Sequence, residues 1–394
     1  MHAAPAAAAR ASCMNAAQGA PVRLIYASLA IACYVFVSLV APLRIRRIFK
    51  LLLGLLLLAA ALKFQLYRFF GGSFFDPGLP AAFRLVCEAL HCALVVLFFL
   101  ALAKDIARLV LRRFGRGLPF SCGLRHAVFM LAALGTGAWS VFQAMRVPDV
   151  RRVEAAMPGL PAELDGFAIV QLSDLHIGPL LDRGWLEKVA EKTNALKPDL
   201  IVLTGDLADG FTSQRMDAVQ PLRTLRARLG VYGVPGNHEY YYDARAWADA
   251  FAAMGVRMLE NEHVTLPGGP VLGGVTDPAA QRFGLPGPDV RKAFEGAPPD
   301  MPKILLSHRP SGKGIPCAEA ALQLSGHTHG GHLFFLRPVI ARFNGGFAGG
   351  MYRTAQGGLL YVSRGTGLWN GFSCRLAVPS EITLIILRRQ PGAA

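Results

Sequence analysis

The chain has 394 residues, enough for two or three domains, and 53% of them are hydrophobic while only 17% are charged. With a mean hydropathy of +0.37, it is too apolar to be one ordinary soluble domain. A formal net charge of +15 would suit a nucleic-acid partner. The basic residues of the N-terminal half, however, lie between apolar segments, as membrane topology requires. We therefore exclude nucleic acid and predict a membrane-associated N-terminal half.

Four apolar segments of that half reach or approach the ~20 residues that a helix needs to cross a bilayer. They are Leu24–Leu43, Ile48–Phe70, Leu85–Ala103 and Ala127–Met145. The second reaches this length only if Lys50, Lys63 and Arg68 extend their amines and guanidinium toward the membrane surface. The first is longer than the apolar core of a signal peptide and has no cleavage site after it. We predict about four transmembrane helices within residues 1–145.

Basic residues are distributed unevenly over the connections between these segments. The first and third connections are rich in them: Arg44, Arg46, Arg47 and Lys50, then Lys104, Arg108, Arg112, Arg113, Arg116 and Arg125. The second, Phe70–Ala82, has none. Basic connections stay in the cytoplasm, so four spans place everything after Met145 outside it. This predicts a multi-pass membrane protein whose C-terminal half lies outside the cytoplasm, and one helix fewer would reverse that side.

Two features of side-chain chemistry allow alternatives. Glu88 and His91 are three residues apart and share one helix face. They could be a functional ionisable pair within the membrane. We favour the other interpretation, a Glu–His contact between helices or near an interface. The seven cysteines include no Cys-x-x-Cys pair, which argues against a zinc ribbon or a redox motif. Cys317 and Cys374 could form a disulfide outside the cytoplasm.

The C-terminal half begins with a polar connector, 146–164, and then alternates short apolar runs with helical stretches, which indicates a layered α/β domain. Helices are expected from Asp182, as N-cap, to Leu196, and at Asp217–Leu229 and Ala244–Met254. Strands are expected at Phe167–Leu172, Asp199–Leu203, Val231–Val234, Val256–Leu266, Pro270–Gly274, Lys303–Leu306, Leu322–Leu324, Leu359–Val362 and Ile382–Leu387.

Five short segments place metal-binding side chains close to glycine or serine. They are Ser173-Asp174-Leu175-His176, Gly205-Asp206, Gly236-Asn237-His238-Glu239, Ser307-His308-Arg309 and Gly326-His327-Thr328-His329. Asp, His and Asn suit divalent first-row metals, and nearly all of these side chains follow a predicted strand. Because the loops at strand carboxyl ends form the ligand crevice of α/β sheets, we expect one pocket. Two ions held close together are a device for cleaving phosphate esters.

The order of these segments resembles the calcineurin-like metallophosphoesterase family over residues 165–370, and its bacterial membrane-associated branch in particular. The resemblance implies a four-layer sandwich of two mixed β-sheets flanked by helices, here over 165–390. It also implies two divalent ions (Mn²⁺, Zn²⁺ or Fe), with Asp174, His176 and His329 on the first and Asp206 bridging both. The second ion would bind Asn237, His308 and His327. His238 would face the leaving group and Asp209 would orient it.

Some neighbouring residues have two interpretations each. His332 is either a neutral donor near the site or a surface residue, and Arg364 either binds substrate phosphate or forms a structural salt bridge. Glu239 more plausibly supports its loop than binds metal. The stretch 277–302, rich in Pro and Gly, reads as a surface loop or lid and carries no recognition pattern.

Three functions are compatible with these observations. The first is a membrane-anchored dinuclear-metal phosphoesterase, acting by metal-bridged hydroxide attack on a phosphoester, preferably a diester and in one version lipid-linked. The second is a pyrophosphatase of lipid A synthesis resembling UDP-2,3-diacylglucosamine hydrolases, at the cytoplasmic face. The third is a catalytically inactive metal-binding sensor, against which the intact ligand segments argue. The sequence predicts no oligomeric state.

Overall fold

The computed structural model describes residues 25–389 except 74–76, 120, 158 and 313, and the described chain divides into two compact units. The helical unit comprises residues 25–144 together with 371–376. The α/β unit comprises residues 145–370 and 377–389. A short piece of the C-terminal chain thus belongs with the N-terminal helices, which no local sequence pattern indicates.

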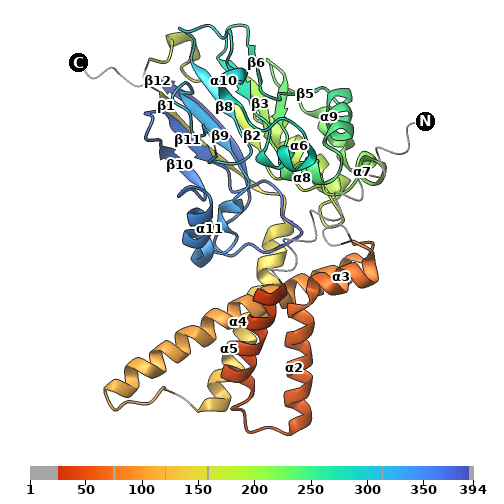
Figure 1. The fold of residues 1–394 in the computed structure, drawn as a ribbon, viewed down its shortest axis with the longest axis vertical. Coiled ribbons are helices and arrows are strands. Elements are labelled where there is room, and N and C mark those ends of the chain that lie inside the picture. The colour runs from red at the N-terminus through yellow and green to blue at the C-terminus, as the bar shows by residue number, and fades with distance from the viewer. Residues whose placement is uncertain (1–24, 74–76, 120, 158, 313, 390–394) are drawn as a thin grey trace. The chain divides into compact units, whose positions relative to one another are not determined.

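The helical unit consists of five helical segments joined by short connections (Figure 1). The first runs over Ile25–Val40 and ends in a π-helical turn, Phe36–Val40. It is followed by α2 Arg47–Ala61, α3 Lys63–Gly71, α4 Ala81–Arg113 and α5 Cys122–Met145. Of these, α4 covers the predicted span Leu85–Ala103, and α5 covers Ala127–Met145.

The prediction of about four transmembrane helices is too high for the described residues. Two helices, α4 and α5, have the length and hydropathy to cross a membrane, and α2 with α3 makes a third if a pair bent by 71° is one span. Ile25–Val40 is a shorter apolar helix, and Leu24, where the first span was expected to begin, lies outside the described residues. The expected span Ile48–Phe70 is interrupted at Leu62, whose ψ of 16° ends α2.

Lys63, which follows this break, does not extend to a membrane surface as expected. Its side chain is fully buried and forms a 2.9 Å ion pair with Glu88 of α4. Its amine also donates to the carbonyl of Gly371, while the Glu88 carboxylate accepts from the backbone N–H of Ser373. A buried amine is stable only when paired and hydrogen-bonded. Glu88 is therefore a contact between helices, and it also holds the 371–376 segment.

The α/β unit contains two six-stranded mixed sheets. The first has the order β1-β12-β2-β3-β4-β5, formed by Asp149–Met157, Glu381–Arg389, Ala168–Leu172, Leu200–Thr204, Val231–Val234 and Val256–Met258. The second has the order β10-β11-β9-β8-β7-β6, formed by Gly350–Arg353, Leu359–Val362, Leu322–Ser325, Lys303–Leu306, Val271–Gly274 and Glu262–Thr265. In each sheet four successive strands are parallel. The first sheet has one antiparallel pairing, β12 with β2, and the second has two, β10 with β11 and β6 with β7.

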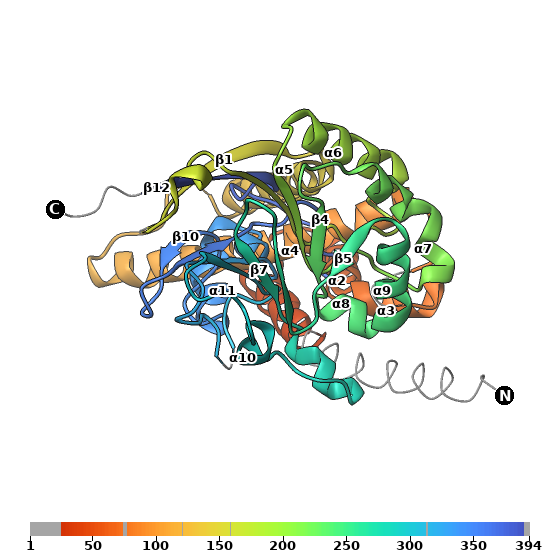
Figure 2. The ribbon, with the colours of Figure 1, turned by 90° about the horizontal axis from the view of Figure 1, so that it is seen from above.

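Helices cover both sides of this pair of sheets, as predicted. Figure 2 shows α6, α7 and α9 on one side and α10 on the other, while α11 packs on the turns around His329–Gly331 and Phe334–Leu336. Their bounds are Arg183–Ala195, Thr212–Val219, Ala244–Ala253, Val290–Ala293 and Arg337–Phe343, with α8 at Asn237–Tyr241 and single turns at Ala162–Leu164, Gln220–Thr224, Pro278–Phe283, His329–Gly331 and Phe334–Leu336. The main core lies between the sheets, where Ile169 and Ile385 of the first sheet belong to the same buried cluster as Leu306 and Leu324 of the second.

Most predicted elements agree with the structure to within one or two residues, and Asp182 caps α6 by accepting from the N–H of Trp185. Three do not. The connector 146–164 contains strand β1, which pairs with β12 from the far end of the chain. The expected strand Val256–Leu266 is two strands in different sheets. The expected helix Asp217–Leu229 ends as α-helix at Val219, because Pro221 cannot donate a backbone hydrogen bond.

The position of β12 between β1 and β2 makes its inward side chains sensitive to truncation. Ile385 is fully buried in the core between the sheets. We expect Ile385→Ala to lower the free energy of unfolding by about 2–5 kcal/mol, because it removes apolar contacts and leaves a cavity. Thermal unfolding of the detergent-solubilised chain, followed by circular dichroism, measures this. Val150→Ala, on the exposed face of β1, is the control, and equal midpoints for the two variants would contradict the packing.

Candidate metal centre

The five predicted ligand segments all lie at the carboxyl ends of parallel strands. Three follow β2, β3 and β4 of the first sheet, and two follow β8 and β9 of the second. Backbone hydrogen bonds join the loops: Asp174 N–H donates to the carbonyl of Gly205, and Gly326 N–H donates to that of His308. The two sheets therefore deliver their strand ends to one shared place, as expected for the crevice of an α/β sheet.

One group of potential ligand atoms comes from the β2 and β9 loops. Asp174, His176 and His329 each offer an atom within 4.8 Å of the others, and all three side chains are buried. The Nε2 atoms of His176 and His329 lie 3.2 Å apart. His329 Nε2 is 3.5 Å from Asp174 Oδ1. These are the three residues expected to hold the first ion.

A second group comes from the β3, β4, β8 and β9 loops. Asp206, His308 and His327 bring their ligand atoms within 4.8 Å of one another. His308 Nε2 lies 3.2 Å from Asp206 Oδ2 and equally far from Asn237 Oδ1. Asp206 also forms a group with His176 and His238, so it lies between the two sets. The assignment of each side chain to one ion stays a prediction, but the structure brings all seven predicted ligands together.

The residues present fit two divalent cations on three observations. Imidazole nitrogens face each other at 3.2 Å in both groups, an arrangement that a shared cation satisfies better than a shared proton. The carboxylates beside them, Asp174 and Asp206, are at most 2% exposed. Backbone φ is positive at five of the seven ligands: Asp174, His176, Asp206, His327 and His329. Such strain, of order 1–3 kcal/mol per residue, persists where the surrounding structure enforces a functional geometry.

The electrostatics of the centre favour bound positive charge. Burial alone would raise the pKa of Asp206, but His308 and His238 hold this pKa well below its usual range. Burial opposes a charged His308, yet Asp206 and then Asp174 raise the pKa of its imidazole to about 10. The same balance of burial against Asp206 and Asp209 raises the pKa of His238 to about 9. Divalent cations would supply the positive charge that the carboxylates otherwise draw from protons.

His238 and Asp209, the predicted catalytic pair, are hydrogen-bonded. His238 Nδ1 lies 2.6 Å from Asp209 Oδ1, and His176 Nδ1 lies 3.1 Å from the same oxygen. The other oxygen, Asp209 Oδ2, accepts from the side-chain amide of Asn370 at 2.8 Å. The carboxylate is fully buried, so these partners fix its orientation and, through it, that of the His238 ring.

Asn370 was missed by sequence reasoning. It follows Gly367-Leu368-Trp369, a stretch without a ligand motif, and lies 161 residues from its partner Asp209. Its side chain is 6% exposed. The neighbouring Trp369 and Gly367 do not indicate a contact to Asp209, so no local signal could have identified Asn370.

Glu239 supports the ligand loops, as expected. Its carboxylate accepts from the backbone N–H groups of Gly236, Asp206 and Leu207 at 2.7–3.0 Å. Gly236 is required by packing, because a Cβ at this position would lie 2.2 Å from Asp206 Oδ1. Residues 206 and 236 therefore approach each other at backbone distance, and a bulkier residue at 236 would displace the shared carboxylate.

The structure also decides between the alternatives for His332 and Arg364. His332 is buried, and its ring stacks on that of His329 with centroids 4.8 Å apart, so it lies beside the centre rather than on the surface. Arg364 Nε lies 3.7 Å from Glu381 Oε2, which is the structural ion pair. Cys317 and Cys374 are free thiols.

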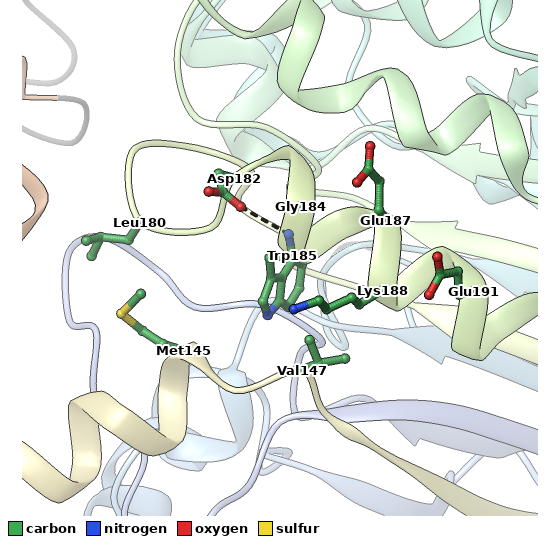
Figure 3. A pocket seen from close by; sticks show the side chains of 9 residues that line it. All are labelled: Met145, Val147, Leu180, Asp182, Gly184, Trp185, Glu187, Lys188 and Glu191. Atoms are coloured by element: carbon green, nitrogen blue, oxygen red, sulfur yellow. Dashed lines mark hydrogen bonds between the residues drawn. The ribbon is translucent and has the colours of Figure 1, made fainter.

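The α/β unit has a pocket of about 630 Å³ that is lined by none of the predicted metal ligands. Figure 3 shows Leu180, Trp185 and Lys188 around it, with Asp182 capping the helix behind. It is lined by Met145, Val147, Leu180, Asp182, Gly184, Trp185, Glu187, Lys188 and Glu191. None of these belongs to the metal-ligand groups, so the chemistry is assigned to the strand-end centre.

Comparison with known proteins gives consistent similarities. A family profile described as calcineurin-like phosphoesterase matches residues 167–331. The chain is 35% identical over 322 residues to a Danio rerio protein named "Transmembrane protein with metallophosphoesterase domain", covering 75% of this chain and 71% of that protein. A Bos taurus protein of the same name is 34% identical over 365 residues, with coverages of 85% and 81%. An uncharacterized metallophosphoesterase of Campylobacter jejuni is 31% identical over 299 residues, with coverages of 74% and 78%.

The position of Asp206 between the two ligand groups generates a prediction about metal content. We expect Asp206→Ala to reduce bound Mn²⁺ from roughly two ions per chain to one or fewer, since a bridging carboxylate serves both positions. Inductively coupled plasma mass spectrometry after gel filtration measures this. Asp217→Ala, whose side chain is 83% exposed, is the control, and full metal content in the Asp206 variant would contradict the shared position.

Proposed function

We propose, from the premise that this chain belongs to the calcineurin-like metallophosphoesterase family, that it is a membrane-anchored phosphodiesterase. The chain is a metal-dependent phosphoric ester hydrolase with two divalent ions. The observation that carries the proposal is the convergence of two carboxylate–imidazole groups, Asp174/His176/His329 and Asp206/His308/His327, with Asp206 also close to His176 of the first group. Such a constellation matches in-line displacement at phosphorus.

A diester is favoured over a monoester by the charge near the ligands. Arg309, which follows ligand His308, pairs with Asp277 at 2.8 Å. Arg364 pairs with Glu381. Both guanidinium groups are therefore neutralised by carboxylates. A singly charged diester needs less positive charge from the protein than a dianionic monoester does.

We assign the chemistry of the protein groups as follows. When bound, two divalent ions would activate water and offset charge on the phosphoryl oxygens. Asp174, His176 and His329 would hold one ion, Asn237, His308 and His327 would hold the other, and Asp206 would contribute to both. In the doubly protonated form of His238, Nδ1–H donates to Asp209 and Nε2–H can stabilise or protonate the leaving oxygen. Asn370 prevents Asp209 from rotating away.

We propose that residues 1–145 anchor the protein and that 165–390 form the catalytic domain, with the connector 146–164 adding β1 to its sheet. The end of α4 and the connection to α5 contain Arg108, Arg112, Arg113, Arg116 and Arg125. The positive-inside rule puts this connection in the cytoplasm. If α5 spans the membrane, the chain after Met145 is then extracytoplasmic, whatever the number of spans before α4. This favours a periplasmic phosphodiesterase of the inner membrane over a cytoplasmic-face pyrophosphatase of lipid A synthesis.

The activity has a direct test. We expect the full-length chain in detergent with Mn²⁺ to hydrolyse bis(p-nitrophenyl) phosphate with a higher kcat/KM than p-nitrophenyl phosphate. His238→Ala should lower kcat by about 10²–10⁴-fold through loss of the general acid, and Asn370→Ala by about 10-fold through loss of a positioning contact. Release of p-nitrophenolate is followed at several pH values. An Asn370→Ala variant with unchanged kcat and pH profile would remove Asn370 from this role, and an inactive parent enzyme would remove the function.

The orientation has a separate test. We expect a reporter phosphatase that is active only outside the cytoplasm to be active when fused after Ala394 in a bacterial host. The same reporter fused after Arg116 should be inactive, because that position lies in the basic connection. The opposite pattern would place the catalytic unit in the cytoplasm and favour the pyrophosphatase.

A further inference from the structure

An apolar surface follows the last metal ligands along the chain. The turn Phe334–Leu336 and helix α11 Arg337–Phe343 contain no buried residue. Phe334, Val339 and Phe343 are 57%, 50% and 80% exposed. We call these three residues and the partly exposed side chains between them the 334–343 patch: Phe335, Leu336 and Ile340. A soluble surface rarely gathers so many large apolar side chains without a partner.

The patch has the periodicity of an amphipathic helix whose apolar stripe faces outward. Leu336, Val339, Ile340 and Phe343 follow the spacing i, i+3, i+4 and i+7, which places them along one face. In a helix packed on a core, this stripe would be buried. Here none of the four is buried, so the α/β unit does not supply the apolar environment that this spacing suits.

The charge around the patch matches an anionic lipid surface. Residues 333–370 contain four arginines and no Asp or Glu. Three of them are exposed: Arg337, Arg342 and Arg353. Aromatic and aliphatic side chains combined with arginine, without acidic residues, are typical of segments that lie in the interface of a bilayer. Arginines near an anionic membrane are attracted to its surface.

A short connection joins the α/β unit to the last apolar helix of the helical unit. The described residues include two helices long and apolar enough to span a membrane, and the second of them, α5, ends at Met145. Three residues, 146–148, separate this helix from the start of β1 at Asp149. The α/β unit is therefore tethered to any membrane that α5 crosses, so lipid is a constantly available partner for an exposed apolar helix.

The patch is also directly attached to the metal loop. Gly331, in the turn His329–Gly331, has a φ of +88°, and a Cβ there would lie 2.7 Å from the Cα of Arg337, the first residue of α11. Between them, His332 stacks on the ligand His329. Whatever surface α11 rests on thus lies close in the chain and in space to the ligand loop.

We propose that the 334–343 patch inserts into the lipid interface and that the substrates are phosphoesters of amphiphiles, whose head groups enter the metal centre from the membrane surface. This substrate class rests on the proposed phosphodiesterase function, whereas insertion of the patch does not. Insertion places α11 among head groups and acyl chains, and the same helix then holds the β9 ligand loop at the depth of the lipid phosphates.

Insertion is tested without any reaction. Full-length Phe343→Trp is reconstituted into vesicles of phosphatidylcholine and phosphatidylglycerol whose acyl chains carry bromine, a quencher of nearby indoles. We expect quenching beyond that of the parent protein for Phe343→Trp but not for Met216→Trp, which places the indole on an exposed site of α7. Equal, parent-like quenching of both variants would show that the patch stays out of the bilayer and would overturn the proposal.

The substrate class is tested with two diesters that share one reactive group. Hexadecyl p-nitrophenyl phosphate is presented in the same vesicles without bromine, and methyl p-nitrophenyl phosphate is presented in water. We expect the double variant Phe334→Ser, Phe343→Ser to lose about tenfold in kcat/KM on the hexadecyl diester, equivalent to ~1.4 kcal/mol. Its activity on the methyl diester should stay within about twofold of the parent, as expected for a surface change.

The outcomes separate the patch from the proposed function. A parallel loss on both diesters, or no loss on either, overturns the assignment of amphiphilic substrates. Failure of the parent enzyme on both diesters with Mn²⁺ present overturns the phosphodiesterase function and with it the substrate class. In that case quenching of Phe343→Trp still decides whether the patch enters the bilayer.

Discussion

Two carboxylates removed from water, Asp174 and Asp206, impose the constraint on which the centre depends. Each is at most 2% exposed, and a buried carboxylate is stable only with compensating positive charge or hydrogen bonds. The imidazoles of His176, His308 and His329 lie within 4 Å of these two carboxylates. This charge balance explains why the ligand loops accept positive φ angles that their residues would otherwise avoid.

The fold satisfies this constraint by a meeting of strand ends. Parallel strands of both sheets stop at the same place, so loops that are far apart in sequence contribute side chains to one small volume. Support then extends outward in a second layer of contacts. Glu239 binds the backbone of two ligand loops, and Asn370 holds the Asp209 carboxylate that in turn holds His238.

The C-terminal chain passes from the α/β unit to the helical unit directly after Asn370. Asn370 ends the portion that belongs to the α/β unit, and residues 371–376 belong with the helices. Within the helical unit, this segment is held by the buried Lys63–Glu88 pair through Gly371 and Ser373. A buried ion pair is costly unless both partners are also hydrogen-bonded. Here those hydrogen bonds hold the chain that directly follows Asn370.

Sequence alone predicted the seven candidate ligands that the structure brings together, because each motif is local: a strand, a turn with glycine or serine, and a polar side chain. The sequence also predicted Asp182 as a helix cap and the bounds of most strands, because these too depend on local signals. Tertiary structure decided what depends on distant partners. Strand β1 forms because β12 pairs with it. Lys63 is buried because Glu88 and the carbonyl of Gly371 accept hydrogen bonds from its amine. Asn370 belongs to the site because its amide donates to Asp209, a residue 161 positions away in the sequence. Periodicity reports only on near neighbours along the chain, whereas these features come from contacts that form when remote segments meet.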